Sequence, residues 1–266
     1  MCELFGICAA HPILANPLLR AFYQHSEKNR DGWGMALFHG RSVSIEKEPL
    51  MASKSDYLKH RLETPIVERA LIAHIREASI GRIEHANCHP FTGEDATGRT
   101  WTLAHNGTLF DGTLTAAYKE KQLGTTDSER VLLYLLDSLK PLQDPYRQAG
   151  PESPAGWADL PEERFSLLEE RIASLAENNN LSLLFYDGTY MYAHTNREAG
   201  LHVREAGGVA LLATKPVFFG GWEQLQMNTL HVFRDGALVW RGKPHDHTFV
   251  LGSKDMTSLF GAYAEL

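Results

Sequence analysis

The sequence predicts an α+β protein in which β-sheets are covered by helices. Two observations lead to this fold class: many short apolar or alternating runs have the length of strands, and longer stretches carry apolar residues at helical spacing. The 266 residues are enough to bury a substantial core. A hydrophobic fraction of 43% and a mean hydropathy of -0.28 are ordinary for a globular protein. Periodicity supports α+β and does not define the layers further.

The first half of the chain mixes strand and helix patterns, beginning with a strand almost at the N-terminus. A turn follows at 12–17, where two prolines interrupt the apolar pattern. His39-Gly40 separates two strands and predicts a hairpin. Asp127 stands where the N-cap of a helix belongs. The predicted strands are 4–10, 33–38, 42–48, 70–75 and 100–105, and the predicted helices are 18–25, 53–62 and 128–139.

The second half opens with a proline-rich stretch at about 141–161, which we interpret as a loop between two halves of one fold. An amphipathic helix over 160–177 comes next. The remainder is β in character, with hairpin turns at Asp187-Gly188 and Asp235-Gly236. Its predicted strands are 181–186, 190–194, 201–204, 209–213, 229–233 and 237–240.

Charge and composition exclude several classes of function. The net charge of -7 and the pI near 6.0 give no basic footprint for nucleic acid. No apolar run approaches the roughly 20 residues of a membrane helix. No lysine or arginine precedes Arg20, so the positively charged start of a signal peptide is missing. Three cysteines are an odd and sparse set, which favours a reducing compartment over a disulfide framework. We therefore expect a cytoplasmic protein without a membrane or nucleic-acid partner.

Cys2 is the first candidate catalytic residue. After removal of Met1 it would become residue one, and its α-amino group, with a reference pKa of about 8, could act as base for its own thiol. Taken alone, a cysteine this close to the N-terminus is more often a small buried hydrophobic residue.

A second signal is Asn106-Gly107 at the end of a predicted strand. An asparagine amide beside a glycine N–H supplies two donors that could face one oxyanion, as acyl transfer requires. Asn-Gly is also the commonest two-residue hairpin turn, and the pair alone favours that interpretation.

Two charged residues could anchor a substrate. Arg76 directly follows a buried strand and could bind a carboxylate bidentately, although a strand-end arginine more often pairs with a structural acid. Asp127, within Thr125-Thr126-Asp127-Ser128-Glu129, could bind an ammonium group, although such stretches usually only cap a helix. A nucleophile, an oxyanion pair and anchors for both charges are together what cleavage of a glutamine side chain needs.

Six motifs make a resemblance to one family specific. In this order and with a cysteine at position 2, they resemble the class-II (N-terminal cysteine) glutamine amidotransferases, most of all the small standalone YafJ-like members. The resemblance is dense over residues 1 to about 135 and looser beyond. The motifs are MCELFGI at 1–7, DGWG at 31–34, AHIREAS at 73–79, NCHPF at 87–91, AHNGTL at 104–109 and TTDSE at 125–129.

The resemblance implies a fold and a chemistry. The fold is a four-layer αββα sandwich with antiparallel sheets, of the N-terminal-nucleophile (Ntn) hydrolase type, as a single domain over residues 1–266. The chemistry is hydrolysis of a γ-glutamyl amide through a γ-glutamyl thioester, with no cofactor and no metal. The implied roles are Cys2 as nucleophile, Asn106 and Gly107 at the oxyanion, Arg76 at the α-carboxylate, Asp127 at the α-ammonium and His74 among the substrate-binding residues.

The sequence departs from the synthase-linked members of the family. These carry Trp-Ala-Thr-His after the arginine, where this chain reads Glu77-Ala78-Ser79-Ile80. In those members the run helps to form a substrate lid and the coupling to an acceptor domain, so the resemblance does not carry either feature over to this chain. Ammonia would be released or passed to a separate partner protein. We interpret His245-Asp246-His247 as a polar tail and not as a metal site.

Several functional hypotheses remain at this point. The first is hydrolysis of glutamine or of a γ-glutamyl conjugate, as in the γ-glutamyl hydrolases of glutathione breakdown or ergothioneine synthesis, which the family resembles. The second is another Ntn reaction, such as penicillin or bile-salt amide hydrolysis, against which Arg76 and Asp127 argue because those pockets are apolar. The third is a catalytically silent binding module.

Overall fold

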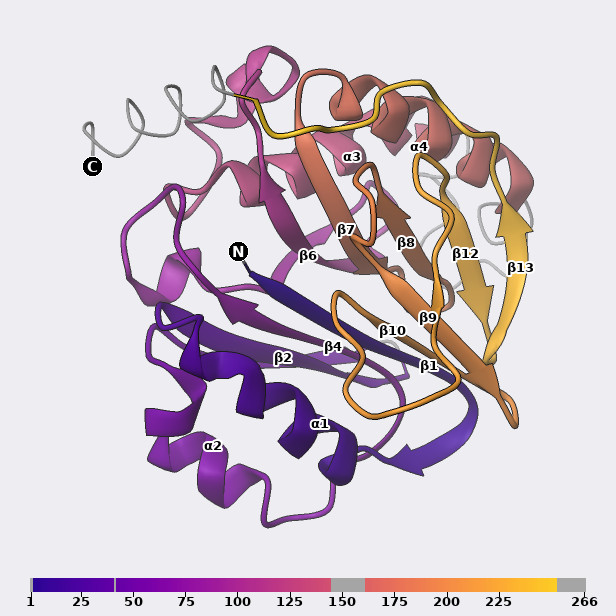
Figure 1. Cartoon of the computed structure of the whole chain (residues 1–266). Coiled ribbons are helices and arrows are strands. Elements are labelled where there is room, and N and C mark those ends of the chain that lie inside the picture. The colour runs from indigo at the N-terminus through magenta and orange to yellow at the C-terminus, as the bar shows by residue number, and fades with distance from the viewer. Residues whose placement is uncertain (1, 41, 145–160, 253–266) are drawn as a thin grey trace.

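The computed structural model describes residues 2–40, 42–144 and 161–252, and these residues form two β-sheets packed face to face. Every pair of neighbouring strands is antiparallel. Helices α1 (Asn16–Tyr23) and α2 (Asp56–Arg61) cover one outer face, while α3 (Asp127–Gln143) and α4 (Pro161–Ala176) cover the other (Figure 1). The predicted α+β class and four-layer αββα sandwich are therefore confirmed.

The first sheet contains the N-terminal strand near its centre, between another strand from the first third of the chain and one from the C-terminal third. Residues far apart in the sequence thus complete the same sheet. In spatial order its strands are β11 (Glu223–Gln224), β9 (His202–Ala206), β10 (Val209–Ala213), β1 (Glu3–Leu14), β4 (Val67–Arg76), β2 (Gly32–His39) and β3 (Ser42–Glu48).

The second sheet is built from hairpin-connected strands of the C-terminal half, joined to two strands from the middle of the chain. The predicted turns Asp187-Gly188 and Asp235-Gly236 connect β7 to β8 and β12 to β13. Its strands are, in spatial order, β13 (Ala237–Arg241), β12 (His231–Arg234), β8 (Met191–Thr195), β7 (Asn180–Tyr186), β6 (Thr100–Thr108) and β5 (Phe91–Glu94).

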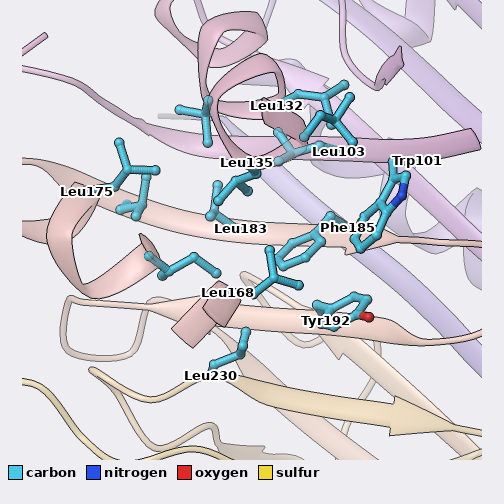
Figure 2. Packing of buried hydrophobic residues seen from close by; sticks show 14 of the residues in the cluster. Trp101, Leu103, Leu132, Leu135, Leu168, Leu175, Leu183, Phe185, Tyr192 and Leu230 are labelled. Atoms are coloured by element: carbon cyan, nitrogen blue, oxygen red, sulfur yellow. The ribbon is translucent and has the colours of Figure 1, made fainter. Parts of the chain in front are cut away.

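The alternation of side chains along each strand divides the core into three layers. In β1, Phe5 and Ile7 face α1, whereas Leu4 and Cys8 face the second sheet. On the far side, leucines of α3 and α4 pack against an aromatic group from the second sheet that includes Trp101 (Figure 2). No helix of the described residues is long and apolar enough to cross a membrane.

Three local predictions were wrong. The turn expected at 12–17 is replaced by the end of β1, which continues to Leu14 after a register shift that follows Cys8, and by the start of α1 at Asn16. Pro12 is tolerated there because an irregular pairing does not need its missing N–H. Asn106-Gly107 is not a hairpin turn, since both residues lie inside β6. The N-cap of α3 is Thr126, whose hydroxyl accepts from Glu129 N–H at 3.4 Å, so Asp127 is the first helical residue.

The proline-rich stretch expected at 141–161 lies largely outside the described residues, since 145–160 are not among them. At its start the prediction of a loop was wrong, because α3 continues to Gln143 with Pro141 in its last turns. At its end, Pro161 opens α4, a position where its fixed φ suits a helix.

Candidate active site

Cys2 directly precedes β1 at the centre of the first sheet and is partly exposed (Figure 1). Its thiol contacts the backbone of Glu77, where Sγ lies 3.3 Å from the amide nitrogen and 3.3 Å from the carbonyl oxygen. The candidate nucleophile therefore lies against the loop that follows β4.

The register of the first sheet places the motif residues in rows. Glu3 pairs with Ile75, so continuing this register by one residue brings Cys2 opposite Arg76. Because side chains alternate, Cys2 points to the same face as Leu4, and Arg76 to the same face as Ile72. Leu4 and Ile72 both belong to the core between the two sheets. Cys2 and Arg76 are therefore neighbours on the face that meets the second sheet.

Arg76 is 2% exposed, and its guanidinium is held by the loop that follows it. Nη1 donates to the carbonyl of Arg82 at 3.1 Å. Nη2 donates to the carbonyls of Ile80 at 3.0 Å and Gly81 at 3.1 Å. The guanidinium has five N–H donors, so these three bonds leave capacity for another acceptor.

Asp127 is buried at the start of α3, where the helix N-terminus favours a negative charge. Its Oδ2 accepts from Leu109 N–H at 2.7 Å, and Oγ of Ser128 lies 3.3 Å from Oδ1. Since Leu109 follows β6 directly, the carboxylate ties the start of α3 to the end of the strand that carries Asn106.

The electrostatic environment of Cys2 includes both charged residues. Burial raises the pKa of the thiol to about 11, the Arg76 guanidinium acts to lower it and the Asp127 carboxylate acts to raise it. A cation and an anion thus lie within electrostatic reach of one sulfur atom. With a pKa this high the thiol carries its proton at neutral pH, so an attack by sulfur requires a base.

Asn106 lies on the face of β6 that meets the first sheet, because Ala104 on the same face belongs to the core between the sheets. It is 1% exposed, and its buried Nδ2 has no hydrogen-bond partner among the described residues. Two residues on, the hydroxyl of Thr108 lies 3.1 Å from that of Ser79, in the loop that contacts Cys2. A buried donor without a partner is uncommon, and a catalytic role is one explanation for it.

Gly107 is required by a close backbone approach. A Cβ at this position would lie 1.9 Å from the carbonyl oxygen of Asn180 and 2.4 Å from Nε2 of His105. The same imidazole bridges two elements, with Nε2 3.2 Å from the Asn180 oxygen and Nδ1 3.0 Å from the hydroxyl of Ser128. A carbonyl oxygen only accepts, so Nε2 carries the proton. His105 thus joins the first turn of α3 to β7.

His74 lies one row deeper than Arg76 and is fully buried. It stacks on His89 with ring centroids 4.1 Å apart, and the ring nitrogens of both have no hydrogen-bond partner among the described residues. Burial lowers the pKa of His74 to about 3 and that of His89 well below its usual value. Both imidazoles are neutral at physiological pH, and a substrate-binding role for His74 stays a prediction.

The DGWG motif has the close backbone contact expected of its glycines. A Cβ on Gly34 would lie 2.1 Å from the carbonyl oxygen of His89, and one on Gly32 would lie 2.8 Å from Sγ of Cys88. The NCHPF segment therefore packs directly on β2, in which Gly32 pairs with Arg76 of β4.

Sequence reasoning quoted Asn87 and Thr125 within motifs but gave neither a role. Asn87 is completely buried and hydrogen-bonds to Thr125 through both its side-chain oxygen and its nitrogen. The sequence does carry a signal for Asn87, because an asparagine with high hydrogen-bonding capacity opens the NCHPF motif.

Two other features lie apart from this site. A cavity of about 310 Å³ at the opposite end of β1 is lined by Cys8, Phe38, Tyr186 and Arg234, among others. His245 lies 3.0 Å from His194 between their Nε2 atoms. In residues 2–40, 42–144 and 161–252, no group of three or more histidine, cysteine, aspartate or glutamate side chains is placed to hold a metal ion.

Comparison with solved structures shows the same fold elsewhere. A protein from Pseudomonas aeruginosa described as a predicted glutamine amidotransferase has a TM-score of 0.63 and 23% identity, with 90% of this chain and 100% of that one covered. Glutamine phosphoribosylpyrophosphate amidotransferase from B. subtilis has a TM-score of 0.60 and 17% identity, with 89% of this chain and 48% of that one covered.

Sequence comparison identifies the family. The chain is 27% identical to an uncharacterized protein of Methanocaldococcus jannaschii over 278 residues, which cover 91% of this chain and 72% of that one. It is 31% identical to the Escherichia coli protein YafJ over 221 residues, which cover 82% of each chain. A family model described as glutamine amidotransferases class-II matches residues 1–207. The chain therefore belongs to the class-II glutamine amidotransferase family, as its six motifs predict.

Proposed function

We propose that this protein hydrolyses the amide of a γ-glutamyl substrate, glutamine or a γ-glutamyl conjugate, with Cys2 as nucleophile after Met1 is removed. The observation that carries the proposal is that two buried residues of opposite charge, Arg76 opposite Cys2 in the sheet and Asp127 at the start of α3, lie within electrostatic reach of the thiol. Arg76 and Asp127 both act on the pKa of Cys2. A cation and an anion at one end of a site suit the α-carboxylate and α-ammonium of an amino acid, whereas the apolar acyl groups of penicillins or bile salts offer no such charges.

The reaction follows from the chemistry of these groups. The α-amine of processed Cys2 takes the thiol proton, and sulfur attacks the amide carbon. The developing oxyanion accepts hydrogen bonds from Asn106 Nδ2 and from the N–H of Gly107. The α-amine of Cys2 then passes the proton to the substrate nitrogen as the C–N bond breaks. The leaving group is ammonia when the substrate is glutamine. Water then attacks the γ-glutamyl thioester, which releases the acid and restores the thiol.

Three features support these roles. Burial raises the pKa of the thiol, so its attack needs a base, and removal of Met1 would expose an α-amino group on the same residue that can serve as one. The unpartnered Nδ2 of Asn106 is a donor already desolvated and ready for a new acceptor. The remaining donor capacity of Arg76 suits a carboxylate, which the membership of the family also favours.

Affinity labelling tests the proposal. Purified protein is treated with 6-diazo-5-oxo-norleucine, a glutamine-like electrophile, and its intact mass is measured together with ammonia release from glutamine. We expect loss of Met1, one covalent adduct on Cys2, and protection by excess glutamine, with no adduct in Cys2→Ala. Release of free ammonia without an acceptor would argue against the need for a partner protein. A processed Cys2 that is never labelled, in protein that cleaves neither glutamine nor γ-glutamyl conjugates, would refute the proposal.

A further inference from the structure

The two charged anchors of the proposed site lie next to two loops that meet at one buried side chain. Arg76 ends β4 and is followed by the loop 77–87, while Asp127 is preceded by the loop 122–126. Asn87, at the end of the first loop, is 0% exposed. It contacts the second loop at Thr125, two residues before Asp127.

The Asn87 amide uses all of its hydrogen-bonding groups on these loops. Oδ1 accepts from Thr125 N–H at 2.7 Å. Nδ2 lies 2.8 Å from Oγ1 of Thr125, 2.9 Å from the carbonyl of Arg82 and 3.1 Å from Oε1 of Glu84. A primary amide has two N–H groups, so one of these three contacts is shared. The buried side chain thus connects both loops, although Arg82 and Thr125 are themselves exposed residues.

The connection reaches Arg76 through a shared carbonyl, and Asp127 along the backbone of the second loop. The Arg82 carbonyl that accepts from Asn87 also accepts from Nη1 of Arg76 at 3.1 Å. On the other side, the Glu129 carboxylate accepts from the N–H groups of Leu123 and Gly124, each at 2.8 Å, which fixes the approach of the second loop to α3.

Glycines in both loops allow this packing. A Cβ on Gly124 would lie 2.2 Å from Oδ1 of Asn87. A Cβ on Gly81, whose φ is +84°, would lie 2.9 Å from Cγ2 of Thr126 and 3.1 Å from Nδ2 of Asn87. The two loops therefore touch through the amide and have little room to move independently.

We propose that Asn87 is a positioning residue that fixes the separation of Arg76 and Asp127, and so makes the site selective for an acyl group carrying both an α-carboxylate and an α-ammonium. This inference rests on the proposed function. Asn87 contacts neither Cys2 nor Asn106 among its recorded partners, so its effect falls on substrate binding more than on the chemical step.

The test compares Asn87→Ala and Asn87→Asp with Asn16→Ala. Asn16 is a matched control, since its buried amide also joins two segments, through Leu62, Thr64 and Ile66, under the outer helices. Asn87→Asp keeps the size and the acceptor for Thr125 N–H, but turns an oxygen toward the Arg82 carbonyl. Each variant is assayed with glutamine and with glutaramate, which lacks the α-ammonium, and its Tm is measured.

We expect both Asn87 variants to raise KM for glutamine roughly 10- to 100-fold, as misplacement of about 1 Å does, with kcat within about threefold of wild type. The preference for glutamine over glutaramate should fall by a similar factor. Asn16→Ala should lower Tm with KM and this preference unchanged. Unchanged KM and preference in Asn87→Asp, with active wild-type protein, would overturn the proposal even if Asn87→Ala fails to fold.

Hydrogen–deuterium exchange separates this inference from the proposed function. In Asn87→Asp, amides in both 80–82 and 123–125 should exchange faster than in wild type, whereas Asn16→Ala should leave both unchanged. Wild-type protein inert toward glutamine and the diazo ketone would refute the proposed function, and exchange would still report on the loops. Faster exchange confined to 80–87, with 123–125 unchanged, would overturn the role of Asn87 as the link between the anchors.

Discussion

Replacing Asn106 by alanine should reduce activity strongly and leave the stability of the fold nearly unchanged. The proposed reaction loses one of two oxyanion donors, which costs a factor of about 10²–10³ in kcat, or roughly 3–4 kcal/mol in the activation free energy. The folded protein loses a buried Nδ2 that has no hydrogen-bond partner among the described residues. Leaving such a donor unpaired costs about 1–3 kcal/mol, and its removal relieves that penalty.

The packing lost with the side chain works against this relief. Deleting a buried group of this size costs about 1–2 kcal/mol through lost contacts and the space left behind. The two effects are similar in size, so we expect the free energy of unfolding of Asn106→Ala to stay within about 1 kcal/mol of wild type. Glutaminase kinetics and urea unfolding of the same preparations measure both quantities.

Asn16→Ala is again the matched control, because this buried asparagine has partners for both ends of its amide. Its Nδ2 donates to Leu62 O at 2.9 Å and Thr64 O at 2.7 Å, and its Oδ1 accepts from Ile66 N–H at 2.7 Å. We expect a loss of roughly 2–4 kcal/mol of stability with kcat unchanged. The reasoning is refuted if Asn106→Ala retains wild-type turnover, or if it loses as much stability as the control.

Three further predictions concern charge, backbone space and pH. Asp127→Asn keeps an oxygen for Leu109 N–H but removes the charge facing the substrate ammonium, so kcat/KM for glutamine should fall by roughly 10²-fold with little change in Tm. Gly34→Ala should destabilise by about 1–3 kcal/mol in urea unfolding, because its Cβ would lie 2.1 Å from the His89 carbonyl oxygen. His74 binds a proton below about pH 6.5 in the unfolded chain but only near pH 3 in the folded protein. The free energy of unfolding should therefore fall by roughly 1 kcal/mol for each pH unit between 6.5 and 3 as the pH drops, and His74→Gln should reduce that slope.

Each of these has a result that would contradict it. Equal activity of Asp127→Asn and wild type toward glutamine would remove the ammonium anchor from the site. Wild-type stability in Gly34→Ala would mean that the NCHPF segment does not depend on its contact with β2. Identical slopes of stability between pH 6.5 and 4 for wild type and His74→Gln would show that this imidazole titrates alike in both states.

Local patterns predicted strands, helices and hairpins well and failed where tertiary contacts override them. Asp235-Gly236 forms the predicted two-residue turn, with φ of 50° and 78°. Asn106-Gly107, with equal local turn preference, continues a strand. The difference is the close approach of Gly107 to the Asn180 carbonyl, a partner remote in the sequence. Local turn propensity therefore predicted the backbone conformation correctly at Asp235-Gly236 and incorrectly at Asn106-Gly107.

Motif order predicts which residues form the candidate site but says nothing of their geometry. Nothing in the spacing of Cys2 and Arg76 indicates that they occupy adjacent strands, because strand register depends on the complete sheet. The roles of Asn87 and Glu129 were missed for a similar reason. Their partners are backbone groups of loops, which side-chain identity does not reveal.

The central place of β1 has a consequence for the order in which the protein is made. Its residues 5–9 pair with β10 (Val209–Ala213), although the family match ends at residue 207. A chain shortened to that boundary would keep all of the proposed catalytic and anchoring residues, yet would leave β1 with unpaired N–H and C=O groups along one side. During synthesis the N-terminus emerges first, and β1 cannot pair on that side until β10 has been made. Under the proposed function, removal of Met1 during synthesis would act on an open strand, before the sheet around Cys2 is complete.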